Sequence, residues 1–304
     1  MSLFLAVDAG GTKTDYLLAD DTSVLARVRG GTIKRMRANA ETTAQNLAEA
    51  LAELTTVSGV SMQSVTRTCI GTAGETVPLV VDWLRESFGR HVSGNLILLG
   101  DVEIALDAAF PGQPGVIVLA GTGSNVAARD GSGKVTTAGG WGPALADQGS
   151  GHRIGQEALR ALFLSIDEER PTRLLAAVLQ LWHLTSVAEI VAFGNSIPAP
   201  DFSQLAKAVL KAAEEGDAVA QEVLEKEGTD LAYLVCLLIG RMRKSPTQAS
   251  LVPPIAFTGS IMENVLPVRR ALIAAVDRQY PGIATLDGVV DPIAGALWRA
   301  RRGY

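Results

Sequence analysis

The 304-residue sequence predicts an α/β fold made of two lobes. Apolar strand segments alternate with helical patterns along the chain, which is typical of α/β proteins. A strand, a glycine-rich turn and a second strand occur twice, with the turns at Gly10 and Gly121, a domain-sized distance apart. At about 150 residues per domain, the length also fits two lobes. The repeated pattern favours a duplicated lobe over an unrelated recurrence of glycine turns.

The first half of the chain alternates strands with helices. Its first two strands flank a turn of glycine and threonine, 8–14, which is the pattern of a β-hairpin. Asn39 is suited to cap the first helix, because its side-chain oxygen can accept a hydrogen bond from a helix N–H group. The elements expected here are strands at 3–7, 16–19, 66–70 and 96–99, a helix from 39 through 54, and a helix at 78–88.

The second half repeats the hairpin pattern and then becomes mainly helical. The turn 121–125 separates two apolar strands, and beyond residue 150 apolar residues recur at helical spacing, most clearly over 217–244. Pro292 suits the first turn of a last helix, where its missing N–H costs nothing. The elements expected here are strands at 115–120, 126–128 and 254–257, loops at 245–247 and 253–254, and helices at 217–244, 262–275 and 291–301.

Composition excludes several classes of protein. Hydrophobic residues make up 47% and charged residues 19%, which is not the composition of a disordered chain. The formal net charge of −5 argues against nucleic acid or an anionic membrane as the main partner. The apolar stretch 231–240 is far shorter than the ~20 residues that cross a bilayer. No basic segment precedes the first apolar run, so we expect no signal peptide and a soluble, cytoplasmic protein.

Three turns of glycine, threonine and serine follow apolar strands, at 8–14, 121–125 and 258–260. Glycine lets the backbone approach a ligand, and consecutive exposed N–H groups bind anions. Two such turns facing each other can hold a polyphosphate. Other nucleotide and nucleophile motifs do not occur in the sequence: the P-loop, G-x-G-x-x-G after a strand, and G-x-S-x-G. The three histidines lack the spacing of a metal site.

Aspartates at strand ends are the next candidates. Asp8 follows the first strand and Asp101 follows the strand 96–99, where an open α/β sheet binds its ligands. Asp147 lies in the glycine-rich block 139–151, just before a helix. A single aspartate in such a place is as often a turn or helix cap. Three of them beside three phosphate-type turns indicate phosphoryl transfer, in which one holds Mg²⁺ and another accepts a hydroxyl proton.

Together these segments resemble the motifs of the actin-like ATPase superfamily, which includes sugar kinases and actin. Within it the sequence is most similar to the BadF/BadG/BcrA/BcrD ATPase family, which includes N-acetylglucosamine kinases. The resemblance covers nearly the whole chain, from residue 3 to about 297. The matching segments are the first phosphate motif at 8–14, the second at 119–125, the block 139–151 and the connecting helix that starts at 291–296.

The resemblance implies two RNase H-like lobes with a cleft between them that closes on Mg·ATP. The N-terminal lobe would comprise 1–115, with a C-terminal helix at 290–304 packing back on it, and the C-terminal lobe would comprise 116–289. It also implies a homodimer that acts on a small sugar, and the charge and hydropathy of the chain leave neither nucleic acid nor membrane as an expected partner.

The resemblance assigns roles to the candidate residues. Asp101 is expected as the general base on the sugar hydroxyl, and Asp8 as the residue that orients Mg²⁺. The expected ATP contacts are Gly10, Gly11, Thr12, Lys13, Thr14, Gly121, Thr122, Gly123, Gly259 and Ser260. The expected sugar contacts are Asp101, Ser124, Gly140, Trp141 and Asp147, although Trp141 is equally consistent with a packed core aromatic.

The sequence departs from the family pattern at three positions. Ile33 stands where relatives carry a sugar-binding Asn, Gln148 where an acidic residue is usual, and Ser260 where a second glycine is usual. The neighbouring Lys34 and Arg35 add positive charge, which would suit an acidic or phosphorylated sugar, but we expect both side chains to point to solvent. The identity of the sugar is therefore left open by the sequence.

The leading hypothesis is an ATP-dependent kinase that phosphorylates N-acetylglucosamine or glucosamine. An alternative within the same family is the ATP-driven activator of 2-hydroxyacyl-CoA dehydratases, which needs a [4Fe–4S] cluster held by cysteine thiolates. Cys69 and Cys236 both lie in apolar segments and read as small buried hydrophobes rather than ligands. A third possibility, suggested by Ile33, is a nucleotide-binding regulator whose sugar pocket has been lost.

Overall fold

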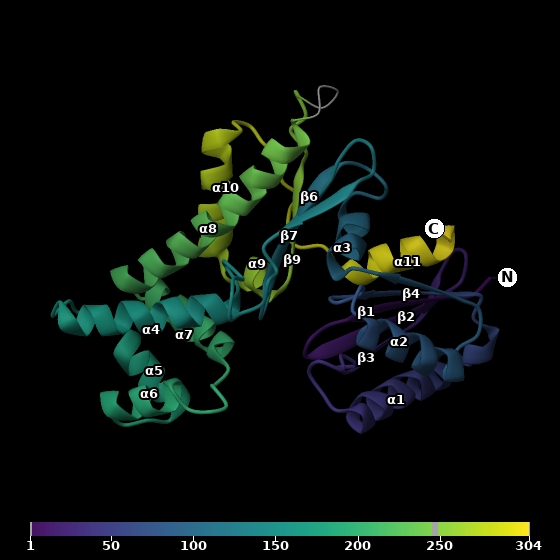
Figure 1. The fold of residues 1–304 in the computed structure, drawn as a ribbon, viewed down its shortest axis with the longest axis horizontal. Coiled ribbons are helices and arrows are strands. Elements are labelled where there is room, and N and C mark those ends of the chain that lie inside the picture. Colours follow the sequence, from purple (N-terminus) through teal and green to yellow (C-terminus); the bar gives the residue numbers. More distant parts are fainter. Residues whose placement is uncertain (1, 245–248, 304) are drawn as a thin grey trace. The chain divides into compact units, whose positions relative to one another are not determined.

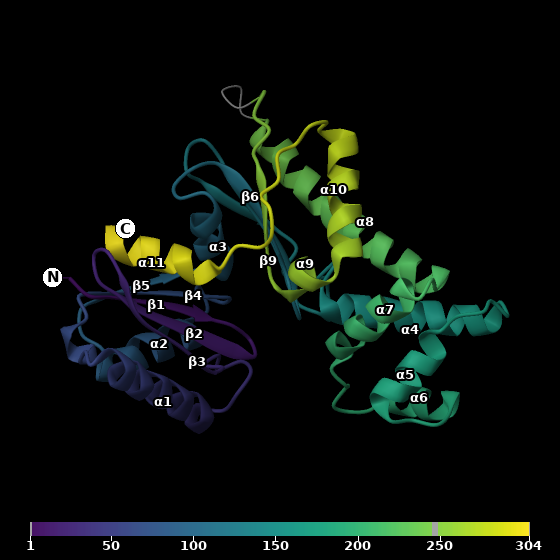
Figure 2. The same cartoon turned by 180° about the vertical axis from the view of Figure 1, so that it is seen from behind.

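The computed structural model describes residues 2–244 and 249–303. The chain forms two compact units. The first, called here the N-terminal unit, comprises Met1–Gly115 and Val290–Tyr304, and the second, the C-terminal unit, comprises Val116–Val289. Figures 1 and 2 show the elements of each unit from opposite sides.

The N-terminal unit is an open sheet with helices on both faces (Figure 1). Its strands lie in the order β3-β2-β1-β4-β5; β1, β2 and β3 are antiparallel, whereas β4 and β5 extend the sheet in parallel. The strands are β1 (Phe4–Ala9), β2 (Lys13–Ala19), β3 (Val24–Gly31), β4 (Arg67–Thr72) and β5 (Asn95–Leu99). The helices are α1 (Ala40–Ser58), the short η1 (Met62–Ser64), α2 (Pro78–His91), α3 (Asp101–Ala109) and α11 (Pro292–Arg302).

Alternation along β1 explains the layers of this unit. Leu5 and Val7 belong to the cluster formed with α1 and α2, and Phe4 and Ala6 belong to the cluster formed with α3 and α11. Successive side chains of a strand point to opposite faces, so both faces of β1 are buried. Both figures show α1 and α2 on one face of the sheet and α3 and α11 on the other.

Helix α11 is fixed firmly to the N-terminal unit although it lies at the end of the chain. A Cβ atom added at Gly295 would lie 1.8 Å from the carbonyl oxygen of Ile104, so only glycine allows α11 to approach α3 this closely. Arg299 forms an ion pair with Asp107, which is fully buried in α3. The Arg67 guanidinium donates to the carbonyl oxygen of Ala300 at 2.6 Å.

The C-terminal unit has a second sheet, in the order β8-β7-β6-β9, and a larger set of helices. Its strands are β6 (Gly115–Ala120), β7 (Ser124–Arg129), β8 (Val135–Ala138) and β9 (Ile255–Thr258). Its helices are α4 (Gly151–Asp167), α5 (Leu174–Trp182), α6 (Val187–Gly194), the short η2 (Phe202–Gln204), α7 (Leu205–Glu214), α8 (Ala218–Met242), α9 (Ser260–Asn264) and α10 (Leu266–Gln279). Helices α8 and α10 run side by side in both figures.

The two sheets repeat one topology. The order β3-β2-β1-β4 of the first corresponds to β8-β7-β6-β9 of the second, and β4 and β9 are each parallel to the strand beside them. Thr285 forms a single parallel bridge with Ile255 of β9, at the edge where the first sheet carries β5. The repeated strand–turn–strand pattern of the sequence therefore corresponds to a repeated sheet.

Most of the predicted elements are confirmed. Asn39 caps α1, with its side-chain oxygen accepting from the N–H of Thr42 at 2.8 Å. The single helix predicted over 262–275 is wrong: α9 ends at Asn264 and α10 begins at Leu266, because Pro267 lacks the N–H that a continuous helix needs. The predicted loop at 245–247 lies outside the described residues.

Helix length and composition also bear on membranes. Among the described residues, no single helix is long and apolar enough to cross a bilayer. The pair α5 and α6 passes the same test only when taken together, and it is bent by 62°.

Candidate functional site

A group of carboxylates lies at the carboxyl end of the sheet in the N-terminal unit. Asp8 is the next-to-last residue of β1, and Asp101 is the first residue of α3, directly after β5. Burial, together with the negative charges of Asp101 and Asp15, raises the pKa of Asp8 from 3.8 to about 7. The Lys34 ammonium acts in the opposite direction but does not compensate. A cation bound here would relieve this excess of negative charge.

Asp101 is held by the start of its own helix. Its Oδ1 accepts a hydrogen bond from the N–H of Val102 at 2.9 Å, and a carboxylate in the first turn is stabilised by the helix dipole. The Glu103 side chain accepts from the N–H of Gly100 at 3.0 Å, which fixes the turn into α3.

Glu75 is a further member of this carboxylate group, and sequence reasoning did not find it. Its Oε1 lies 3.5 Å from the position of a Cβ added at Gly100, beside Asp101. Burial raises its pKa, and the charges of Asp101 and Glu103 raise it further. Glu75 lies in the loop between β4 and α2 and directly follows the segment 71–74, which contains Gly71, Thr72 and Gly74. This glycine-containing turn at a strand end was the available sequence signal.

The β1–β2 turn divides the predicted phosphate residues into two groups. Gly11, Thr12 and Lys13 are exposed and available to a ligand. Thr14 is fully buried, and its hydroxyl oxygen accepts from the N–H of Ile33 at 3.3 Å. Thr14 therefore connects the turn to the segment that follows β3.

Three turns meet at one end of the second sheet. The N–H of Gly151 donates to the carbonyl oxygen of Gly121 at 2.8 Å, which joins the second phosphate turn to the start of α4. The Ser260 hydroxyl lies 3.7 Å from the position of a Cβ added at Gly121. Gly259 has φ +94°, and a Cβ there would lie 2.4 Å from the carbonyl oxygen of Ala120, so this turn requires glycine. The candidate nucleotide residues of this unit are thus close together.

The block 139–151 brings the predicted sugar residues of this unit together. Asp147 is buried with φ +75°, and its Oδ1 accepts from the N–H of Gly142 at 3.1 Å. Its Oδ2 is 2.9 Å from the position of a Cβ added at Gly123, beside the phosphate turn. The Ser124 hydroxyl donates to the carbonyl oxygen of Gln148 at 2.7 Å.

Trp141 and Gly140 lie in the same block but in different surroundings. Trp141 is 74% exposed, so the interpretation of it as a core aromatic is wrong. Gly140 lies against Asn125, whose carboxamide carbon is 2.7 Å from the position of a Cβ added at the glycine. An exposed indole beside a polar block suits contact with the apolar face of a sugar ring.

Glu227 of α8 supports this block from inside the unit. The carboxyl group is fully buried, and its Oε2 accepts from the N–H of Gly149 at 2.7 Å. Its Oε1 lies 3.8 Å from Arg153 Nε and 3.7 Å from Lys226 Nζ. Burial raises the pKa of Glu227, while the Gly149 N–H and the Lys226 and Arg153 charges lower it. A charged residue at an apolar position of the α8 stripe was the available sequence signal.

The two cysteines are buried, as predicted. Cys69 is fully buried in β4, and burial raises its pKa to about 12. Cys236 is buried in α8, and burial raises its pKa as well. Thiols in such surroundings stay protonated, whereas metal ligation needs the thiolate.

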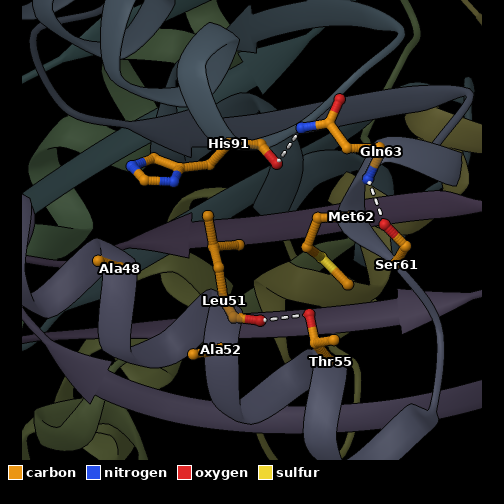
Figure 3. A pocket seen from close by; sticks show the side chains of 8 residues that line it. All are labelled: Ala48, Leu51, Ala52, Thr55, Ser61, Met62, Gln63 and His91. Atoms are coloured by element: carbon orange, nitrogen blue, oxygen red, sulfur yellow. Dashed lines mark hydrogen bonds between the residues drawn. The ribbon is translucent and has the colours of Figure 1, made fainter.

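The pocket in Figure 3, about 270 Å³ in volume, lies elsewhere in the N-terminal unit. It is lined by Ala48, Leu51, Ala52, Thr55, Ser61, Met62, Gln63 and His91, and none of these is a predicted site residue. The Gln63 side chain donates to the backbone oxygen of His91 at 3.1 Å, and the His91 ring points away from Met62. The pocket is therefore separate from the carboxylate group.

The family model of the BadF/BadG/BcrA/BcrD ATPase family matches residues 5–300. The chain belongs to this ATPase family. The resemblance read from the sequence motifs is thereby confirmed.

Relatives of this BadF/BadG-type ATPase include sugar kinases. The chain is 26% identical to an N-acetylmuramic acid/N-acetylglucosamine kinase of Clostridium acetobutylicum, over 99% of both chains. It is 25% identical to an N-acetyl-D-glucosamine kinase of Dictyostelium discoideum, over 97% of this chain and 96% of that one. A solved structure from Chromobacterium violaceum, assigned as an N-acetylglucosamine kinase, is 26% identical over 98% of both chains, with a TM-score of 0.74.

A more distant structure shares the fold. The ROK family glucokinase of Streptomyces griseus, solved with glucose and AMPPNP, has a TM-score of 0.58 and 17% identity. The structural match covers 99% of this chain and 100% of the glucokinase chain. The α/β fold predicted from the sequence is therefore that of the actin-like ATPase sugar kinases.

The raised pKa of Asp8 predicts a pH-dependent stability in metal-free protein. In the unfolded chain Asp8 loses its proton near pH 4, whereas in the folded chain it does so near pH 7. Between these values the folded state binds more protons, so the contribution of Asp8 to stability is full below pH 4 and is lost as the pH rises through 7. Asp8→Asn should match wild type at pH 4 and exceed it at pH 8, by at most about 4 kcal/mol.

Urea unfolding from pH 4 to 8 in the presence of EDTA measures this difference. The quantity to compare is the difference in unfolding free energy between wild type and Asp8→Asn at each pH. Other carboxyl groups with raised pKa values, such as Glu75 and Glu227, affect both proteins alike and cancel in this difference. If the free energies of unfolding of wild type and Asp8→Asn changed with pH in the same way, the raised pKa of Asp8 would be contradicted.

Glu227 is predicted to stabilise the glycine-rich block through its acceptor oxygen. Glu227→Ala leaves the buried N–H of Gly149 without a partner and opens a cavity, which should lower the free energy of unfolding by about 3 kcal/mol. Glu227→Gln keeps an acceptor and should cost less than about 1 kcal/mol. Glu225→Ala, on the exposed side of α8, is the control and should change it by less than about 0.5 kcal/mol. Equal losses for the Ala and Gln variants would show that the charge matters and not the acceptor.

Proposed function

We propose that this protein is an ATP-dependent kinase that transfers the γ-phosphoryl group of ATP to a hydroxyl of an amino sugar: N-acetylglucosamine, glucosamine or N-acetylmuramic acid. The observation that carries the proposal is the pair Asp8 and Asp101 at the strand ends of the N-terminal unit, in a chain whose full-length relatives are amino-sugar kinases. A requirement for Mg²⁺, a cytoplasmic location and a homodimer belong to the same proposal.

Asp101 is the proposed general base. The N–H of Val102 occupies one oxygen of its carboxylate and orients the group. The other oxygen is then available to accept the proton from the sugar hydroxyl as that hydroxyl attacks the γ-phosphorus.

Asp8 is the proposed contact to Mg²⁺. Its oxygen donors suit this hard cation, which in kinases is commonly held by one or two carboxylates together with substrate phosphates. The excess negative charge around Asp8 is the structural observation that fits a bound cation. When bound, Mg²⁺ neutralises charge on the phosphates. Among the described residues no cluster of three or more metal-binding side chains occurs, so substrate oxygens would complete the coordination.

The remaining candidates are assigned to the two substrates. Gly10, Gly11, Thr12 and Lys13 are proposed to bind phosphate oxygens, with Thr14 holding their turn in place from the core. Gly121, Thr122 and Gly123 are proposed to bind phosphates from the C-terminal unit, and Gly259 and Ser260 to lie against the nucleoside. Ser124, Gly140, Trp141 and Asp147 are proposed to contact the sugar.

The structure weakens the support for the two alternative functions. The dehydratase activator requires thiolate ligands, whereas Cys69 and Cys236 are buried in the cores of different units. The regulator was suggested by Ile33, but that side chain is 1% exposed and packs in the hydrophobic core. Its presence is therefore explained by packing and does not indicate a lost sugar pocket.

The general-base role predicts that Asp101→Asn lowers turnover about 10²- to 10⁴-fold, because the amide cannot accept the hydroxyl proton. A coupled ADP-release assay with Mg·ATP measures it, against N-acetylglucosamine, glucosamine, N-acetylmuramic acid, glucose and no sugar. The affinity of Asp101→Asn for ATP, measured by calorimetry, should equal that of wild type. Asp82→Asn, at an exposed position of α2, is the matched control and should retain full activity. Undiminished turnover by the Asp101 variant would refute the assignment.

A further inference from the structure

The segment that follows β3 carries three basic residues, Lys34, Arg35 and Arg37, and is fixed to the β1–β2 turn. The Thr32 hydroxyl donates to the carbonyl oxygen of Gly10 at 2.9 Å. The N–H of Ile33 donates to the hydroxyl oxygen of Thr14, and the Ile33 side chain is buried in the core. The backbone that carries the three cations therefore has a fixed place beside the candidate site.

Two of the three cations face groups of the candidate site. The Lys34 charge lowers the pKa of Asp8, which places the ammonium near that carboxylate. Arg37 Nε is 3.9 Å from the position of a Cβ added at Gly11, so Arg37 lies over the turn proposed to bind phosphates. Arg37 is also exposed, as a residue that meets a diffusing nucleotide would be.

Arg35 is different, because the inner part of its guanidinium is buried without a partner. Its Nε and Nη1 atoms are buried, and within residues 2–244 and 249–303 neither has a hydrogen-bond acceptor. Other half-buried arginines of this protein are paired: Arg299 with Asp107, and Arg153 with Glu157 and Glu227. An unpaired buried cation is unfavourable, so the arrangement indicates that an acceptor arrives with a ligand.

We propose that Arg35 determines specificity by binding an anionic group, a carboxylate or a phosphate, on the acceptor sugar. This inference rests on the proposed kinase function and names the class of its substrate. The planar guanidinium matches either anion through two parallel hydrogen bonds. The segment that carries Arg35 is fixed to the β1–β2 turn beside Asp8, through the contacts of Thr32 with Gly10 and of Ile33 with Thr14. Lys13 is proposed to bind the nucleotide phosphates and Arg37 lies over the same turn, whereas the buried Nε and Nη1 atoms of Arg35 have no acceptor among the described residues.

The test compares a neutral with an anionic acceptor. N-acetylmuramic acid carries a carboxylate that N-acetylglucosamine lacks, and kcat/KM for both is measured with wild type, Arg35→Gln and Arg35→Lys. Wild type should prefer N-acetylmuramic acid. Arg35→Gln should lower kcat/KM for it about 10- to 100-fold, as expected for the loss of one charge-assisted pair, with less than about threefold change for N-acetylglucosamine and for the KM of ATP. Arg35→Lys keeps the charge without the paired donors, so its kcat/KM for N-acetylmuramic acid should lie between those of wild type and Arg35→Gln.

A phosphorylated acceptor distinguishes the two anions. N-acetylglucosamine 6-phosphate is tested as a competitive inhibitor, and inhibition that Arg35→Gln abolishes, without a preference for N-acetylmuramic acid, would identify phosphate as the anion. Arg90→Gln, on the exposed side of α2, is the matched control and should leave kcat/KM for both sugars unchanged. Thermal unfolding of each variant shows whether the fold is retained.

Three outcomes would overturn the inference. Equal losses for both sugars with a raised KM for ATP would assign Arg35 to the nucleotide. Unchanged selectivity in a folded Arg35→Gln variant would show that the guanidinium has no role in choosing the sugar. Wild type that turns over neither sugar would refute the proposed function, and calorimetric binding of N-acetylmuramic acid to wild type but not to Arg35→Gln would then still test the role of Arg35 separately.

Discussion

The close placement of Asp8 and Asp101 is the constraint on which the candidate site depends. Parallel pairing of β1, β4 and β5 brings the strand ends together, and the resulting burial and repulsion raise the pKa of Asp8 to about 7. Such an arrangement is stable only in a rigid support. The support is the sheet covered on both faces, with α11 held against α3 at Gly295 and through the Arg299–Asp107 pair.

The C-terminal unit has a different role: its glycine-rich turns hold several backbone N–H groups close together at one end of the second sheet. Close backbone approaches at Gly121, Gly151 and Gly259 bring three turns together. Asp147 is then fixed by the N–H of Gly142, and Glu227 fixes Gly149 from behind. One unit therefore supplies carboxylates for proton and cation chemistry, whereas the other supplies hydrogen-bond donors for anions, which is the division of labour that phosphoryl transfer needs.

Local sequence patterns correctly predicted the features that are determined by residues adjacent in the sequence, namely turns and helix caps. The β1–β2 hairpin, the turn after β6 and the Asn39 cap are each specified by neighbouring residues. Local patterns mark Glu75, after a glycine-containing turn, and Glu227, in the apolar stripe of α8, but they do not identify the partners of these residues. Those partners, Gly149 for Glu227 and the Gly100 turn for Glu75, lie far away in the sequence. The surroundings of Arg35 were also beyond prediction: the sequence favoured a side chain that points to solvent, whereas its Nε and Nη1 atoms are buried in a segment fixed to Gly10 and Thr14.

The central claim is that phosphate leaves ATP for a sugar and not for water. Phosphorus NMR of a complete reaction with Mg·ATP and N-acetylmuramic acid or N-acetylglucosamine tests it most directly, because it identifies the product. The account predicts a sugar phosphomonoester that accumulates one-to-one with ADP. Inorganic phosphate as the sole product beside ADP, with every sugar offered, would contradict it and leave an ATPase without a sugar acceptor.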